Sequence, residues 1–357
     1  MANVKVTLWR QDVRIRFPVR AADELHAGRS RLFVAVEENG VAGYGEVAPQ
    51  PQDLNGDAAL TDVIDEARIF VVPQLQQILE HEGDLPSWTR VARFAGSRTA
   101  SNPAVALLEM ALLDRELRVA RASIDSLWPL RFETPVQQTV SLLDETDWFI
   151  DSEAVRARAK IGGGPLSDVH YRQLEELEIP VLLDYNCSAR SDADVIEQVR
   201  RIRRFADVVG VEQPYAVGNV VDSARLAEQL DVPVSIDEGV RSVRDVGQIV
   251  RYHAGAMICV KPARVGGLAN ARTIIARAQE EGLRAYVGGF FESPYGRRVN
   301  RWLANSCVDE PSDLSPVDVV LEGYPREVDA VSDGFGLSPA PEMLERCAVL
   351  VAVESAI

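Results

Sequence analysis

The stretch IPVLLDYNCSARSDADVIEQVRRIRRFADVVGVEQ, residues 179–213, contains a complete strand–helix–strand unit. Its two ends, 179–185 and 207–213, are short apolar runs rich in β-branched residues, which is typical of strands buried on both faces. The segment between them, 192–205, spaces its apolar residues as one face of a helix does. A helical crossover of this kind joins two strands that run parallel in one sheet.

The same unit repeats about every 25 residues from residue 135 onward. Seven runs predict strands, at 136–142, 155–161, 179–185, 207–213, 232–238, 256–262 and 283–289. Helical patterns separate them, for example at 192–205 and 270–282. Seven βα units, with an eighth strand expected near 303–308, favour a closed (β/α)8 barrel over an open sheet. We therefore predict an α/β fold in which residues 126–319 form a modified, TIM-like barrel that carries the catalytic site.

The two ends of the chain have a different pattern. Residues 1 to about 50 alternate apolar and polar side chains as strands do, and 58–120 have helical spacing, with a long helix beginning at Asn102-Pro103. The tail, 320–357, is predicted to be loop-like and to return to the N-terminal part. These features predict an α+β capping domain of residues 1–125 that is completed by 320–357.

Composition narrows the class of protein. The net charge of −16 argues against nucleic acid as a partner, because phosphate backbones bind basic faces. No apolar run reaches the roughly 18 residues of a membrane span, and the N-terminus lacks the apolar block of a signal peptide. The four cysteines form no CxxC pair. We expect a cytoplasmic protein with no membrane or nucleic-acid partner, and the sequence leaves its oligomeric state open, a homo-oligomer included.

Lysine is rare in this chain. Of 38 basic residues only three are lysines, namely Lys5, Lys160 and Lys261. A G+C-rich coding bias is the simple explanation. However, a site that needs an amine able to lose its proton cannot use arginine, whose pKa stays above about 12. The two internal lysines are therefore candidates for chemistry.

Five consecutive predicted strands end in a polar residue of a useful type. Spacings of 24, 28, 25 and 24 residues separate Lys160, Asp184, Glu212, Asp237 and Lys261. Because the catalytic groups of such barrels lie at the carboxyl ends of the strands, three carboxylates should converge with a lysine on each side. Any one of these acids alone is equally well explained as a helix cap or turn residue, and a lone lysine as a solvated one. The complete ordered set is much harder to explain in that way.

Three converging carboxylates repel one another unless a cation neutralises them. Mg²⁺, with Mn²⁺ as a substitute, is the hard divalent ion that oxygen ligands prefer. Such an ion can chelate a substrate carboxylate and stabilise the enediolate that forms when a proton is removed beside it. A lysine near the ion in a partly dry site is expected to have its pKa lowered toward about 7–8, which makes it a usable base.

At these residues the chain resembles the enolase superfamily, in its muconate-lactonizing subgroup. The K-x-K motif of the family corresponds to Arg158-Ala159-Lys160, and the helix that joins its two domains resembles LLEMALLDREL, 107–117. The resemblance implies Lys160 and Lys261 as catalytic residues and a Mg²⁺ site at Asp184, Glu212 and Asp237. It also implies a small-molecule carboxylate as substrate, with contacts expected from Arg158, Asn186, Thr139, Gly289 and Glu292.

Within the subgroup, KPARVGG (261–267) and GGFFES (288–293) look most like o-succinylbenzoate synthases and N-acylamino-acid racemases. No histidine lies in 283–300, where mandelate-racemase types carry a base. Two departures affect substrate choice: Arg158 replaces a lysine, and ESPYGRR (292–298) replaces a glycine-rich segment. Specificity is expected in the capping loops at about 17–28 and 47–56.

The resemblance favours a syn dehydration of the o-succinylbenzoate synthase type, in which Lys160 is the base and Lys261 steadies the enediolate. The alternative is an N-acylamino-acid racemase that uses both lysines as bases, or another isomerase or cycloisomerase of the subgroup. An alternative of another class is a barrel that binds a carboxylate without turnover. Binding alone would not require two titratable lysines.

Overall fold

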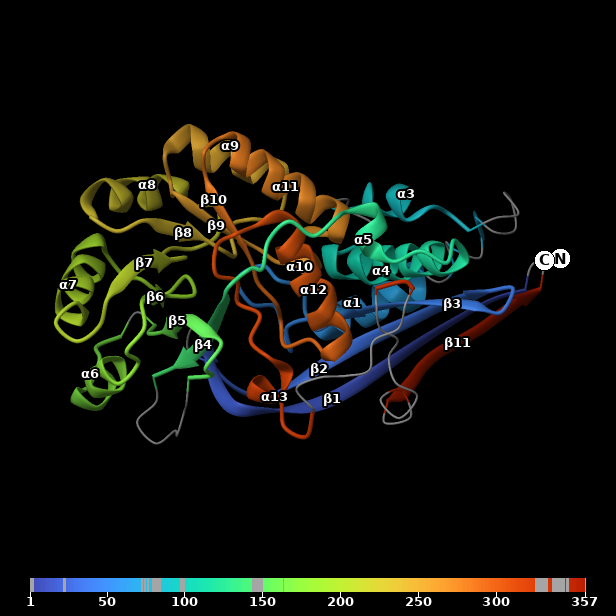
Figure 1. Ribbon diagram of the computed structural model, residues 1–357, viewed down its shortest axis with the longest axis horizontal. Coiled ribbons are helices and arrows are strands. Elements are labelled where there is room, and N and C mark those ends of the chain that lie inside the picture. The colour runs from blue at the N-terminus through green and yellow to red at the C-terminus, as the bar shows by residue number, and fades with distance from the viewer. Residues whose placement is uncertain are drawn as a thin grey trace.

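The computed structural model describes most of the 357 residues. The described residues are 3–21, 24–71, 73, 75, 77–78, 85–96, 100–142, 150–162, 164–324, 333–335, 344 and 347–356. Figure 1 shows two parts, an antiparallel sheet with helices on one side and a curled parallel sheet with helices around it. Within the described residues, no helix is both long and apolar enough to cross a bilayer.

The capping part is built on a four-stranded antiparallel sheet with the strand order β11-β1-β2-β3. Its strands are β1 (Asn3–Ala21), β2 (Glu24–Glu38), β3 (Val41–Val47) and β11 (Ala348–Ala356). Asn3 pairs with Ala356, so the two ends of the chain lie side by side at the far end of this sheet (Figure 1). The tail therefore returns to the N-terminal part as expected, but 348–356 is a strand and the prediction of a loop there was wrong.

Helices cover one face of this sheet. They are α1 (Leu60–Glu66), the π-helical turn η1 (Ala67–Val71), α3 (Trp88–Ala92) and α4 (Asn102–Val119). The short helix α5 (Ile124–Leu127) follows, and its Ile124 packs into the core of the second part. Helix α4 packs so closely on β3 that a Cβ at Gly45 would lie 2.0 Å from the carbonyl oxygen of Leu107. Only glycine permits this approach, which lets α4 bury apolar side chains against both the sheet and the second part of the molecule.

The second part is a seven-stranded parallel sheet with the strands in chain order from β4 to β10. The strands are β4 (Val136–Ser141), β5 (Ala154–Lys160), β6 (Val181–Asp184), β7 (Val208–Glu212), β8 (Val234–Ile236), β9 (Met257–Val260) and β10 (Arg284–Val287). All seven lie inside or within one residue of the runs predicted from sequence. Most of their residues are buried, as expected for strands covered on both faces.

The sheet curls until its two edge strands approach each other through one short segment. Ser312 forms a single parallel bridge with Val136 of β4, and Asp313 forms one with Gly288 beside β10. The eighth strand expected near 303–308 is wrong, because those residues complete helix α12 (Pro294–Cys307) and its C-terminal boundary. What the structure shows is a curled seven-stranded sheet bridged at 312–313.

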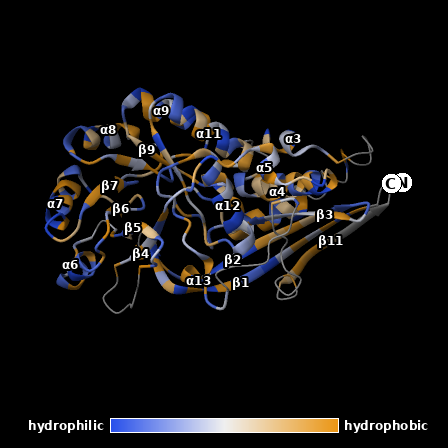
Figure 2. Ribbon diagram, viewed as in Figure 1, coloured by the Kyte–Doolittle hydropathy of each residue, from blue (hydrophilic) through white to orange (hydrophobic). Residues whose placement is uncertain are grey.

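Helices cover the outside of the curled sheet. They are α6 (Asp168–Glu175), α7 (Asp192–Ile202), α8 (Val220–Gln229), α9 (Val243–Tyr252), α10 (Pro262–Val265), α11 (Leu268–Glu280), α12 and α13 (Val317–Val320). Figure 2 shows hydrophilic and hydrophobic residues alternating around α6 to α9, with apolar side chains such as Val195 and Ile249 fully buried. The same amphipathic pattern predicted a helix at 192–205, where α7 lies.

A buried carboxylate joins the two parts. Glu109 of α4 is fully buried and accepts hydrogen bonds from the backbone N–H groups of Leu268 (3.1 Å) and Ala269 (3.0 Å), the first residues of α11. The exposed N–H groups of a helix start favour a negative charge at this position. Gly267 precedes α11 with φ of +113°, and a Cβ there would lie 2.6 Å from the Glu109 carboxylate. Helix α4 thus fixes the segment that follows Lys261.

Candidate active site

The five strand-end residues singled out in the sequence lie along one edge of the parallel sheet. Lys160, Asp184 and Glu212 are the last residues of β5, β6 and β7 and are neighbours in the strand register. Asp237 and Lys261 directly follow β8 and β9. All five are buried, and the three acids have no exposed surface. Fixed unit spacing and parallel register together account for this convergence.

Each lysine forms an ion pair with an acid on a neighbouring strand. The Lys160 Nζ donates hydrogen bonds to Asp184 Oδ2 and Asn186 Oδ1, both at 2.7 Å. Lys261 Nζ donates to Asp237 Oδ2 at 2.7 Å. Burial alone would lower the pKa of Lys261, but the charge of Asp237 outweighs it and the pKa is raised. The lowered lysine pKa expected from sequence applies to a site that holds a divalent ion, and it stays a prediction.

Arg158 lies among the three acids. Its Nη1 is 2.8 Å from Glu212 and 3.9 Å from Asp237, and its Nε is 3.7 Å from Asp184. On its other side, Nη2 is 2.9 Å from Asp313 Oδ2, and Nε donates to the Thr139 hydroxyl at 3.0 Å. Although burial opposes it, these carboxylates hold the pKa of Arg158 well above its ordinary value.

The pKa values of the three acids are shifted in different directions by their surroundings. Burial would raise the pKa of Asp184, but Lys160 and Arg158 lower it below its ordinary value. Arg264 and Lys261 likewise outweigh burial at Asp237, whose pKa is well below its usual range. Burial raises the pKa of Glu212 to about 8, and the neighbouring acids add to this shift although Arg158 opposes it. Of the three acids, Glu212 is thus the one at which nearby cations do not outweigh burial and the repulsion of its neighbours.

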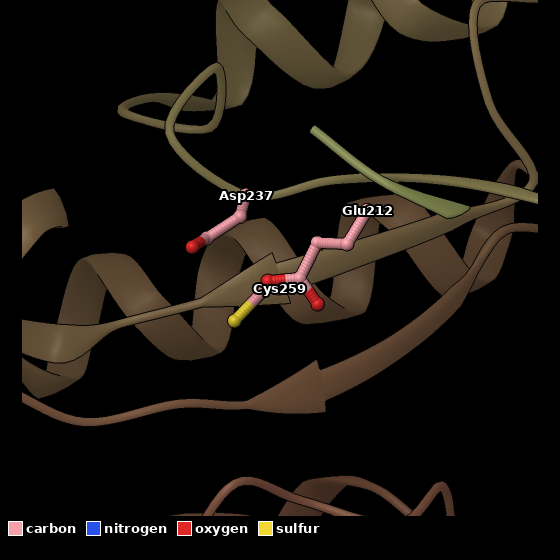
Figure 3. Close-up of side chains that lie close together, drawn as sticks. All are labelled: Glu212, Asp237 and Cys259. Atoms are coloured by element: carbon pink, nitrogen blue, oxygen red, sulfur yellow. The ribbon is translucent and has the colours of Figure 1, made fainter. Parts of the chain in front are cut away.

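Three side chains of the site bring potential metal ligands close together. Glu212, Asp237 and Cys259 each offer a ligand atom, and these atoms lie within 4.8 Å of one another (Figure 3). Two buried carboxylates with converging negative charge suit a hard ion such as Mg²⁺. The thiol does not, and burial raises the pKa of Cys259 well above its ordinary value, which keeps it neutral. Asp184 stands outside this close group, on the Lys160 side of Arg158.

A cavity opens above these residues, with a volume of about 950 Å³ when the space at its mouth is counted. Both capping segments expected to shape it contribute to its wall, through Phe17, Val19 and His26 and through Gln50, Leu54 and Asn55. Residues 22–23, within the first of these segments, lie outside the described residues. The strand-end side contributes Arg158, Lys160 and Lys261.

The remaining residues proposed to contact substrate are placed as follows. Thr139, Asn186 and Gly289 line the cavity. The Thr139 hydroxyl donates to Asp313 at 2.8 Å, and the Asn186 amide donates to Glu238 at 3.1 Å. Glu292 is buried behind the wall, where it accepts the N–H of Phe290 at 2.7 Å. Its carboxylate thus supports the loop that carries Gly289 and Phe290.

Several residues at the site carried no signal in the sequence. Arg264 connects the two parts, since its guanidinium lies 2.8 Å from Asp57 of the capping part and also pairs with Asp237. The Tyr286 hydroxyl donates to Glu212 and lies 2.9 Å from the Ser235 hydroxyl. Arg264 lies in the motif KPARVGG, but the motif did not indicate what this side chain binds. Contacts such as Arg264 to Asp57, which are 207 positions apart, have no local signature.

Comparison with known proteins agrees with this architecture. Residues 158–315 match the family described as "Enolase C-terminal domain-like". The chain is 30% identical over 280 residues to an o-succinylbenzoate synthase from Geobacillus kaustophilus, covering 75% of this chain and 72% of the relative. It is 29% identical over 278 residues to an N-succinylamino acid racemase from an Amycolatopsis species, covering 71% and 73%. The solved structure of an N-succinyl Arg/Lys racemase from Bacillus cereus superposes over the full length of both chains with a TM-score of 0.82 at 16% identity, which is a likeness of fold.

Proposed function

The chain belongs to the enolase superfamily, in the subgroup of the muconate-lactonizing enzymes, and on that premise we propose that it removes a proton adjacent to a substrate carboxylate, most specifically as an o-succinylbenzoate synthase. The observation that carries the proposal is the buried row of Lys160, Asp184, Glu212, Asp237 and Lys261 beneath one cavity. We assign this site to a (β/α)8-type barrel of residues 126–319, with 312–313 in the place of the eighth strand. Residues 1–125 and 320–357 are its cap.

A divalent cation, for which we propose Mg²⁺ held by Asp184, Glu212 and Asp237, supplies when bound the positive charge that stabilises the enediolate. Arg158 adds a fixed positive charge on the same side, oriented by Thr139 and Asp313. A planar guanidinium held in this way suits a carboxylate of the substrate.

Lys160 is the proposed base. Its amine is held by Asp184 and Asn186 and borders the cavity, so it can reach a proton on a bound ligand once it is neutral. Lys261 enters the cavity from the other end of the row and steadies the negative charge that develops. The ring of Phe290 lies 4.9 Å from its Nζ and keeps water from this side.

N-acylamino-acid racemisation is the second candidate. The observation that favours it is the similar setting of the two lysines, each buried and each 2.7 Å from one aspartate. Two amines in matched settings suit two bases that serve opposite faces of one carbon. The identity to the Amycolatopsis racemase supports the same alternative.

Proton exchange tests the shared half-reaction. The protein is incubated with Mg²⁺ and a panel of carboxylates in D2O, and loss of the α-proton signal is followed by NMR. We expect exchange with at least one N-acylamino acid or one dehydration substrate of the o-succinylbenzoate type. Product analysis then separates dehydration from racemisation. If no carboxylate exchanges although Mg²⁺ binds, the proposed half-reaction is wrong.

A further inference from the structure

Arg29 differs from the other long basic side chains that line the cavity. These lysines and arginines are Arg29, Arg158, Lys160, Lys261, Arg264 and Arg297. The last five each have a carboxylate oxygen within 4.0 Å. In the described part of the chain, no carboxylate lies that close to Arg29.

The surroundings of Arg29 leave its hydrogen-bonding capacity partly unused. The residue is 4% exposed, and its Nη1 donates to Gln50 Oε1 at 2.6 Å. Its buried Nε has no hydrogen-bond partner among the described residues. The rings of Phe290 and Phe291 lie 5.8 and 5.7 Å from its guanidinium carbon. The ring faces attract the cation but leave the Nε–H without a hydrogen bond, and a buried donor of this kind is costly unless a ligand binds to it.

The two nearest protein acids are already engaged elsewhere. Asp57 and Glu292 act on Arg29 only through longer-range attraction. Asp57 pairs with Arg264, and Glu292 lies 3.5 Å from Arg297. Burial lowers the pKa of Arg29 to about 10, so the side chain remains charged at neutral pH. Its charge is therefore available to a ligand.

Arg29 lies within reach of a small ligand whose reacting carbon is beside Lys261. Phe290 separates the two cations, with its centroid 5.8 Å from the guanidinium carbon and 4.9 Å from the lysine Nζ. The two groups are thus no farther apart than the sum of these distances, about 10.7 Å. A molecule with two carboxylates and a short spacer can contact the strand-end site and Arg29 together.

We propose that Arg29 is a specificity residue that binds a second carboxylate of the substrate, at the end remote from the reacting carbon. The inference rests on the proposed function, since it places the reacting carbon at the lysines. Arg29 belongs to the cap, so its contact with the ligand also links substrate identity to closure of the two parts. A bidentate carboxylate would use the Nε donor that the protein leaves without a partner.

The test compares two probes that differ by one charge. N-succinylphenylalanine carries the remote carboxylate, and its succinamoyl counterpart carries a neutral amide of the same shape. Both are measured by α-proton exchange in D2O and by isothermal titration calorimetry with Mg²⁺ present. The variants are Arg29→Met, Arg29→Lys and the control Arg31→Met. Arg31 is two residues along the same strand and fully buried, but it does not line the cavity and lies over Tyr324.

We expect the wild-type protein to prefer the succinyl probe by about 10–100-fold, the usual range for a charge-assisted hydrogen bond. Arg29→Met should remove this preference mainly through KM and binding affinity, whereas Arg29→Lys should retain part of it. Arg31→Met should change both probes equally. The proposal is overturned if Arg29→Met keeps the preference or weakens both probes by the same factor.

The calorimetric arm separates this proposal from the proposed reaction. If neither probe exchanges its proton, the reaction assigned to these probes fails, yet a charge-dependent binding difference that disappears in Arg29→Met still supports the subsite. If exchange occurs with equal efficiency for both probes, the reaction stands and the subsite is wrong. Thermal melting of each variant confirms that the comparison is made on folded protein.

Discussion

Lys261 and Asp237, which directly follow the neighbouring strands β9 and β8, form a buried ion pair with 2.7 Å between Nζ and Oδ2. The same carboxylate also pairs with Arg264. Asp237 therefore balances two cations, and its charge raises the pKa of Lys261 although burial and Arg264 oppose the shift. An amine whose pKa is raised suits the stabilisation of negative charge, which is the role that the dehydration proposal gives to Lys261.

Exchanging the lysines for arginine separates the two reactions. Lys160→Arg keeps the charge but removes the dissociable proton, so α-proton exchange should fall by a factor of about 10²–10⁴. Lys261→Arg should keep part of a dehydratase activity. In a racemase it should abolish reaction of one enantiomer while Lys160 still exchanges the other. NMR exchange rates with each enantiomer measure this, and wild-type turnover by Lys160→Arg would refute the proposed base.

Glu212 gives a test of the metal site that does not depend on turnover. Glu212→Gln replaces a carboxylate, which a bound ion would hold ionised, by a neutral amide, so the Mg²⁺-dependent increase in melting temperature should disappear. The change also leaves Arg158 without its 2.8 Å partner, and for this reason the metal-dependent shift is compared rather than the melting temperature itself. Cys259→Ser is the matched control and should preserve the shift. A full Mg²⁺ response in Glu212→Gln would exclude Glu212 as a ligand.

The buried acid at the start of α11 predicts a pH-dependent stability. Burial raises the pKa of Glu109 from 4.5 to about 7, against the two N–H groups that lower it. The folded protein thus holds this proton more tightly than the unfolded chain. The contribution to stability is complete below about pH 4.5 and is lost as the pH rises through about 7.

Urea unfolding at pH 5 and pH 8 measures this effect. Wild-type protein should lose about 2–3 kcal/mol more than Glu109→Gln between these values, because the amide does not titrate. Subtracting the pH-dependent change in unfolding free energy of Glu109→Gln from that of the wild type removes the contribution of the other titrating groups. Parallel pH curves for wild type and variant would show that Glu109 is ionised throughout.

Two glycine-to-alanine changes should have opposite effects. Gly267→Ala places a Cβ against the Glu109 carboxylate at a backbone φ of +113°, and it should reduce the unfolding free energy by at least about 2 kcal/mol. Gly247→Ala lies inside α9 with nothing within 4 Å of the new Cβ, and it should stabilise the protein by about 0.5–1 kcal/mol. Denaturant titration of both variants checks the signs. Equal changes would mean that the α4–α11 junction tolerates a side chain at Gly267.

The sequence predicted the parallel strands well because each is a short, mostly buried run, and β5 to β9 end in or are directly followed by a charged residue. The closing contact was not predictable in this way, since Ser312 and Asp313 form single bridges and have no apolar run. The eighth strand was instead predicted at 303–308. Its apolar residues Leu303 and Ala304 belong to the buried face of α12, whose helical period was missed.

The residues of the site likewise fall into those that the sequence predicted and those that it did not. Lys160 through Lys261 could be found because strand spacing and register bring local sequence features to one edge. Arg29 and Asp57 could not be found, because they reach the cavity only through packing of the cap on the barrel part. Asp313 was equally hidden, since its role as the partner of Arg158 depends on how the curled sheet is bridged.

The pairing of β11 with β1 has a consequence for synthesis on the ribosome. Strand β1 emerges before the parallel sheet is made, but its partner along 3–10 is made after that sheet, at 348–356. The parallel sheet can therefore assemble while one edge of the antiparallel sheet still exposes unpaired backbone groups. A nascent chain stalled before residue 348 would carry this open edge, and chaperones that bind extended strands should associate with it until 348–356 has emerged.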